Sequence, residues 1–198
     1  MVFDSLAALT LFLSAIAVWW LSRDARAPAR IPLRFATVLL AAFAVAWGLG
    51  LFGFPELMPV VAMMALSLGG AAMALSLFAA LGRPLPVLAS VLGLMLALFS
   101  ALAAPLAGSP LYALACVFIA GLLVIGMSIS KFAGVPGRAL LAMGAMLALV
   151  IGGFTMLEGA WMPTLLLFAA GLIGAARASE LGVESRQSRE TLGAIATR

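Results

Sequence analysis

The sequence predicts an all-α polytopic membrane protein, a bundle of seven transmembrane helices with the N-terminus outside and the C-terminus in the cytoplasm. Composition is the first indication, because 66% of the 198 residues are hydrophobic and only 9% are charged, whereas soluble domains carry about 25% charged residues. The second is that the apolar residues fall into seven stretches of roughly bilayer length. The third is that basic loops alternate with acidic or uncharged ones. A bilayer accepts this much apolar surface when helices satisfy their own backbone hydrogen bonds.

The seven stretches approach the length that a bilayer core of about 30 Å requires, which is about 20 helical residues. We expect helices over 2–22, 31–53, 57–82, 85–107, 110–130, 138–157 and 162–176. The first is followed, not preceded, by positive charges at Arg23 and Arg26. A cleaved signal peptide has the reverse order, so we expect this helix to be retained. The last stretch is the shortest, and either tilts little or extends past Arg177.

Prolines mark the boundaries of these helices. Proline is tolerated in a first helical turn, where its missing N–H has no helical partner to lose. The boundary prolines are Pro28, Pro32, Pro55, Pro59, Pro84, Pro86 and Pro163. No proline lies deep within a stretch, so the sequence does not predict the discontinuous helices that often build binding sites in transporters.

The charges of the loops set the predicted orientation. Every lysine and arginine before the tail falls in or beside the first, third and fifth loops, and the tail itself begins at Arg177. The second and sixth loops carry only Glu56 and Glu158, and the fourth carries no charge. The positive-inside rule makes the basic side cytoplasmic. We therefore expect residues 1–177 to form the transmembrane domain and residues 178–198 to form a short polar cytoplasmic tail, partly helical or disordered.

The chemistry of most enzyme and metal sites is missing from this chain. It has no histidine and a single cysteine, Cys116, which excludes histidine general bases, histidine-containing zinc sites and iron–sulfur clusters. No ionisable residue is expected at the bilayer centre, where proton relays and ion pathways place such groups. We therefore predict no catalytic residue, no cofactor and no metal, and we expect neither an enzyme nor a nucleic-acid-binding protein.

A few residues remain as candidates for a ligand site. Trp47 lies beside Gly48 and Gly50, and a tryptophan next to glycines can form the wall of a pocket; the alternative is simple packing toward the membrane. Glu56 and Glu158 could line an outer vestibule, or could be solvated loop charges.

Small residues recur along single helix faces. One row is Ala65, Gly69, Ala72 and Ser76, and another is Gly144, Ala148 and Gly152. Such rows let helix backbones approach closely in lipid. They predict either packing within this bundle or a face for a partner subunit.

The segments around Met58-Pro59 and Met162-Pro163 echo each other, since each is preceded by a glutamate and followed at the same spacing by Gly-Ala-Ala. An offset of four helices would give parallel repeats in a 3+1+3 arrangement, as some transporters have. Chance repetition in a chain this rich in small residues is the alternative.

These observations favour a non-enzymatic accessory or assembly subunit of a larger membrane complex. The alternative is a small permease or lipid-handling protein for a neutral or apolar molecule, and a membrane sensor is the third choice. The expected partners are membrane lipids and either other membrane subunits or further copies of the chain. The expected location is a bacterial cytoplasmic (inner) membrane.

Overall fold

The computed structural model describes residues 2–50, 53 and 56–196, and within them the chain is 86% helical without a strand. The elements are α1 (Val2–Leu21), α2 (Ala27–Gly50), α3 (Leu57–Met64), η1 (Ala65–Gly69), α4 (Gly70–Ala80), α5 (Val87–Leu106), α6 (Leu111–Lys131), α7 (Pro136–Leu157) and α8 (Trp161–Ala196). The predicted all-α class is therefore confirmed. In the described chain, six helices are long and apolar enough to cross a membrane, and α1 offers a shorter apolar stretch, Ser5–Leu21.

The third predicted helix contains an unpredicted segment. α3, η1 and α4 follow one another with helical backbone angles at their junctions, and η1 is a turn of π-helix. A π-helical turn is a local widening of an α-helix. Here it ends at Gly69, the residue that faces the ring of Phe168.

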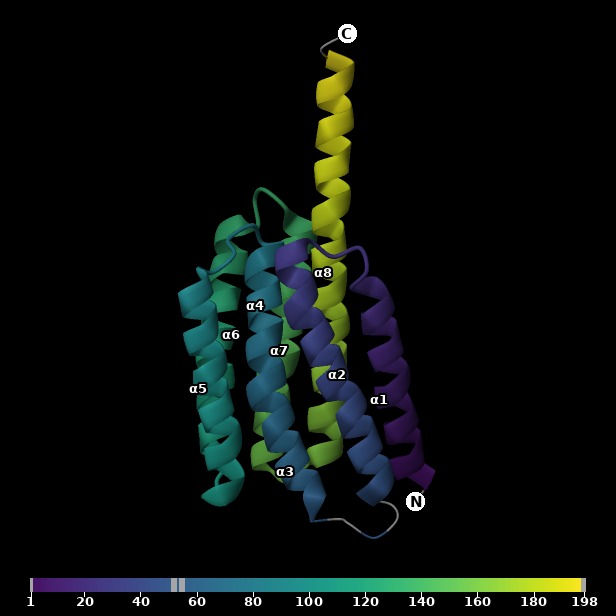
Figure 1. Cartoon of the computed structure of the whole chain (residues 1–198), viewed down its shortest axis with the longest axis vertical. Helices are drawn as coiled ribbons and strands as arrows, with labels where there is room; N and C mark the ends of the chain where they lie inside the picture. Colours follow the sequence, from purple (N-terminus) through teal and green to yellow (C-terminus); the bar gives the residue numbers. More distant parts are fainter. Residues whose placement is uncertain (1, 51–52, 54–55, 197–198) are drawn as a thin grey trace.

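The helices lie side by side, and, with α3, η1 and α4 taken as one continuous helix, consecutive helices run in opposite directions (Figure 1). The loops after α1, α4 and α6 lie at one end of the bundle, where α8 continues beyond it. This end carries Arg23, Arg26, Arg83 and Lys131, and we refer to it as the arginine-rich end. The end of α2, the start of α3 and the loops after α5 and α7 lie at the opposite end.

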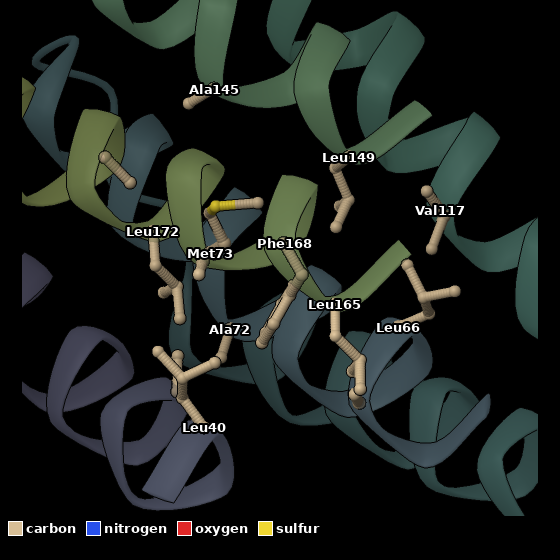
Figure 2. Packing of buried hydrophobic residues seen from close by; sticks show 14 of the residues in the cluster. Leu40, Leu66, Ala72, Met73, Val117, Ala145, Leu149, Leu165, Phe168 and Leu172 are labelled. Carbon is tan, nitrogen blue, oxygen red and sulfur yellow. The ribbon is translucent and has the colours of Figure 1, made fainter. Parts of the chain in front are cut away.

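The most interior segments are the α3–η1–α4 helix and α8. Of their candidate membrane spans, 72% and 56% of the residues are buried, against 22% for α5, which is peripheral. Figure 2 shows Met73, Leu165, Phe168 and Leu172 in the contact between these two helices. All four are fully or almost fully buried.

Each of these two central helices places a large side chain against a glycine of the other. A Cβ added at Gly69 would lie 2.2 Å from Cζ of Phe168, and one added at Gly171 would lie 3.2 Å from Cε of Met73. The glycines thus allow the close approach that drives helix association in lipid. The middle of the bundle is consequently filled with side chains.

Two helices differ in length from the prediction. α2 begins at Ala27 rather than near residue 31, because its two early prolines are accommodated near the helix start. α8 extends far past the expected 162–176 and runs to Ala196, which at 1.5 Å per residue makes it about 54 Å long. Gly182 does not interrupt it.

Candidate functional site

The buried polar side chains inside the bundle are mostly serines and threonines that bond to their own helices. Ser67 donates to the carbonyl of Met63 at 3.0 Å, and Thr37 donates to the carbonyl of Leu33 at 2.8 Å. Across the described residues, no group of three or more histidine, cysteine, aspartate or glutamate side chains could hold a metal. These hydroxyls therefore satisfy local backbone groups and do not form a site.

Trp47 lies inside the bundle, with 6% of its surface exposed, as part of the main apolar cluster. Its indole Nε1 is buried and has no hydrogen-bond partner in the described structure. Gly48 is half-buried with open space beside it, and Gly50 is the last residue of α2. The ligand role of these three residues stays a prediction.

The two predicted vestibule residues both lie at the opposite end of the bundle. Glu56 precedes α3 and Glu158 follows α7, and both side chains are exposed. The vestibule role also stays a prediction.

The two predicted small-residue rows have different surroundings. Ala65, Gly69, Ala72 and Ser76 are all buried within the bundle. In the second row, Gly152 is buried against the backbone of Thr164, Ala148 is half-buried, and Gly144 is exposed with no atom within 4 Å of an added Cβ. Only Gly144 thus leaves its face open to an outside partner.

An apolar hollow on the side of the bundle was not predicted from the sequence. It has a volume of about 480 Å³ and lies between α2, α4 and α5 at the arginine-rich end. We call it the lateral crevice. It is lined by Pro28, Ile31, Pro32, Phe35, Ala72, Leu75, Ala79, Pro84, Leu85, Val87, Ser90, Val91 and Leu94. Among these residues only Ser90 has a polar side chain, so the crevice suits an apolar molecule.

The crevice exists because α5 packs closely along only one of its halves. The buried residues of α5 are Ala97, Ser100, Ala101 and Ala104, all in the second half. Their small side chains recur at helical spacing and allow close contact with the bundle. The first half presents larger residues, and none of its residues is buried. α5 therefore leaves a gap beside α4 near its beginning.

The connection before α5 directs it away from α4. α4 ends with hydrogen bonds from Arg83 N to Phe78 O and from Gly82 N to Ala79 O, the pattern of a Schellman motif. Gly82 has a φ of +82°, which the motif requires and which glycine adopts without strain. Pro84 and Pro86 then prevent the helix from resuming immediately.

A second, smaller hollow of about 150 Å³ lies on the other side of α5, toward α6. It shares Leu75 and Leu85 with the lateral crevice and includes Cys116. The first half of α5 thus stands between two apolar hollows. Small residues are more frequent in the second half of α5 than in the first, but the first half also has Ala89, Ser90 and Gly93, so the sequence alone did not predict this arrangement.

Buried arginine contacts hold the arginine-rich end together. Arg138, 8% exposed, donates from Nη1 to the carbonyl of Ala80 at 3.1 Å, and Arg26 donates from Nη2 to the carbonyl of Gly182 at 2.9 Å. A Cβ at Gly182 would lie 3.2 Å from Nη1 of Arg138 and 3.6 Å from Nε of Arg26. The first bond connects α7 with α4, and the second connects the segment just before α2 with α8.

Comparison with known proteins gives no match to any protein-family model, curated protein or solved structure. The functional argument therefore depends on the geometry of this chain alone.

Proposed function

We propose that this chain is a non-enzymatic integral membrane protein that binds an apolar, lipid-like molecule in the lateral crevice. It crosses the membrane seven times, with its N-terminus outside and its arginine-rich end in the cytoplasm. The positive-inside rule supports this orientation, since basic loops and the α8 extension share one end.

The observation that carries the proposal is the crevice itself. Its volume of about 480 Å³ falls within the range of about 300–1,000 Å³ that small-molecule sites occupy. Its lining is apolar apart from Ser90. Because it lies between membrane-spanning helices at their periphery, an apolar molecule can enter it sideways from the bilayer.

Binding is better supported than transport across the membrane. Along α4 the crevice runs from Ala79 to Ala72, which is about 10 Å at 1.5 Å per residue. That depth is less than one leaflet of a hydrocarbon core about 30 Å thick. Beyond it, Phe168 and Met73 fill the centre of the described bundle. These features favour the lipid-handling function over a permease.

The absence of grouped reactive residues supports a role without catalysis. Membrane hydrolases and transferases require a nucleophile with a base, or carboxylates that hold a metal. The crevice lining offers one serine hydroxyl and no titratable group.

Blocking the crevice tests the proposal. Val91 lines it and is 50% exposed, so Val91→Trp adds bulk to the crevice without crowding the core. Leu92, 60% exposed, lines neither hollow, and Leu92→Trp is the matched control. Native mass spectrometry of protein purified in mild detergent should show a retained lipid on the wild type and on Leu92→Trp, but not on Val91→Trp. Equal retention by all three proteins would contradict the proposal.

An assembly subunit is the second candidate, and exposed glycines on α6 and α7 favour it. A Cβ added at Gly121 of α6 would lie 2.9 Å from the side chain of Val150 of α7. The two helices are antiparallel, so Gly126, which follows Gly121, lies at about the same level as Gly144, which precedes Val150. Gly126 and Gly144 are both exposed, with open space beside them. A partner helix could therefore approach α6 and α7 closely at these two glycines.

Replacing one of these glycines tests the assembly role. Gly144→Leu should reduce the mass of the native complex in mild detergent, whereas Leu147→Phe, an exposed site on the same helix, should not. A wild-type chain that purifies alone and monomeric would rule this candidate out.

A further inference from the structure

The polar groups around the lateral crevice are arranged in an order that matches a particular kind of lipid. Arg83 directly precedes Pro84 and Leu85, two lining residues at the arginine-rich end. Ser90 lies within the crevice, one helical turn beyond Val87 on α5. Deeper still, the lining residues Ala72 and Leu94 are apolar. From the mouth inward the crevice therefore offers a positive charge, then a hydroxyl, then apolar surface.

We propose that the occupant of the crevice is a glycerophospholipid from the leaflet at the arginine-rich end. One acyl chain lies along α4 and α5, an ester carbonyl accepts a hydrogen bond from Ser90, and the phosphate lies against Arg83. This inference rests on the proposed function, and adds to it the chemical class of the ligand and the residue that binds its headgroup.

Arg83 is positioned to meet a phosphate. It is the residue after Gly82 in the Schellman motif, and its side chain is exposed. Among the described residues it forms no ion pair with a carboxylate; the recorded pairs join Arg177 to Glu180 and Glu184. A guanidinium binds phosphate through short, charge-assisted hydrogen bonds.

The arginines of the neighbouring α2 segment are directed elsewhere. Arg26 binds the carbonyl of Gly182, Arg30 donates to the carbonyl of Ala25 at 3.2 Å, and Arg34 lies 5.1 Å above the ring of Trp19. The side chains of these three arginines are thus engaged by protein groups, although Arg30 and Arg34, like Arg83, are next in sequence to lining residues of the crevice. Arg83 is therefore the cation that the headgroup of a bound lipid would meet.

The Ser90 hydroxyl differs in its bonding from three buried serines of other helices. Ser67, Ser76 and Ser128 each donate to a carbonyl three or four residues earlier in their own helix. In the described structure the Ser90 hydroxyl has no such bond, although its backbone N–H donates to Pro86. Val87 and Ser90 are three residues apart, which is about 4.5 Å along the helix. At this depth the hydroxyl can donate to the carbonyl of an ester group that lies below a phosphate.

A partner transmembrane helix fits the crevice less well than a lipid chain. Such a helix is about 10–12 Å wide with its side chains and spans the whole hydrocarbon core. The crevice ends at Ala72 and Leu94, part of the way into the bundle. An acyl chain needs no continuation beyond that depth.

Lipids that share acyl chains but differ in the headgroup test this inference. Delipidated protein in mild detergent is titrated with dioleoyl phosphatidylglycerol or dioleoylglycerol, and occupancy is measured by native mass spectrometry. One arginine near a phosphate surface contributes about 1 kcal/mol, or about fivefold in Kd. The wild type should prefer phosphatidylglycerol by about that factor. Arg83→Gln should lose the preference without weakening binding of dioleoylglycerol.

The controls separate this inference from the proposed function. Arg23→Gln changes another exposed arginine of the same end, one with no lining residue of the crevice next to it in the sequence, and it should keep the preference. Ser90→Ala should weaken binding of both lipids, since both carry ester groups. If both lipids bind equally to wild type and Val91→Trp abolishes both, the crevice binds an apolar molecule but the phospholipid assignment is wrong. If neither lipid binds the wild type, both proposals fail.

Discussion

Glycine and phenylalanine meet at the centre of the bundle with no room for a methyl group between them. The Phe168 ring is fully buried and lies edge-on to Phe43, with ring centroids 6.5 Å apart. It cannot move away from Gly69 without displacing other core side chains, because membrane protein interiors, like soluble ones, are close-packed. Small residues at this position therefore determine how closely the two central helices approach.

Gly69→Ala should destabilise the protein, whereas Gly144→Ala should not. The added Cβ at position 69 overlaps the Phe168 ring, while at position 144 it meets open space. Overpacking of a filled core costs about 1–3 kcal/mol. Unfolding by SDS titration in mixed micelles measures the difference in the free energy of unfolding. A Gly69→Ala protein as stable as Gly144→Ala would show that the ring adjusts freely.

These two glycines also mark where sequence-based prediction reaches its limit. Both belong to rows of small residues along one helix face, so the sequence predicts close packing for either. Which row is interior depends on the order of helices around the bundle. That order arises from contacts between distant segments, such as α8 against α4, and a local pattern does not contain it.

Among the helices, α5 combines a closely packed half with a half that stands free. Its second half contacts the bundle through alanines, and its first half lies between the two hollows. The two halves should therefore tolerate added bulk differently.

Ala101→Leu should lower the free energy of unfolding by about 1–3 kcal/mol, as overpacking does, while Ala89→Leu should leave it nearly unchanged. Ala101 is fully buried, whereas Ala89 is exposed beside the smaller hollow. The same SDS titration applies to both. Equal effects would mean that α5 packs uniformly along its length.

The end of α4 depends on an arginine from another helix. The last carbonyls of a helix have no partner within it, and that of Ala80 accepts a hydrogen bond from the buried Arg138 of α7. Arg138→Gln should cost about 1–3 kcal/mol, the penalty for leaving a buried polar group unsatisfied. Arg23→Gln, at an exposed site of the same end, should cost little. Thermal unfolding in detergent compares the two, and similar midpoints would refute a structural role for Arg138.

The helix boundaries were predictable to within a few residues for most helices, because proline, glycine and loop charges mark them. The length of α8, which runs to Ala196, was not predictable in this way. A glycine such as Gly182 weakens an isolated helix, yet here it lies close to the guanidiniums of Arg26 and Arg138, 3.6 and 3.2 Å from an added Cβ. A tertiary contact thus overrides the local propensity, and only the assembled bundle reveals it.

For the molecule as a whole, the unequal distribution of charge between its two ends predicts its orientation. The arginine-rich end carries the loops after α1, α4 and α6, and the opposite end carries Glu56 and Glu158. Moving basic residues to the outside during insertion is disfavoured. If the crevice binds a lipid, as we propose, the same orientation determines from which leaflet that lipid enters.

Single cysteines introduced into a Cys116→Ser background test this orientation, because the chain has no other cysteine. Ala107 and Ala133 are exposed alanines in loops at opposite ends of the bundle. A membrane-impermeant maleimide should label Ala107→Cys in intact cells, and Ala133→Cys only after lysis. The reverse pattern would invert the proposed orientation.

A cysteine near the start of α1 tests whether this helix crosses the membrane. If it does, Ser5→Cys should be labelled under the same conditions as Ala107→Cys. If Ser5→Cys is instead labelled under the same conditions as Ala133→Cys, the chain has six crossings.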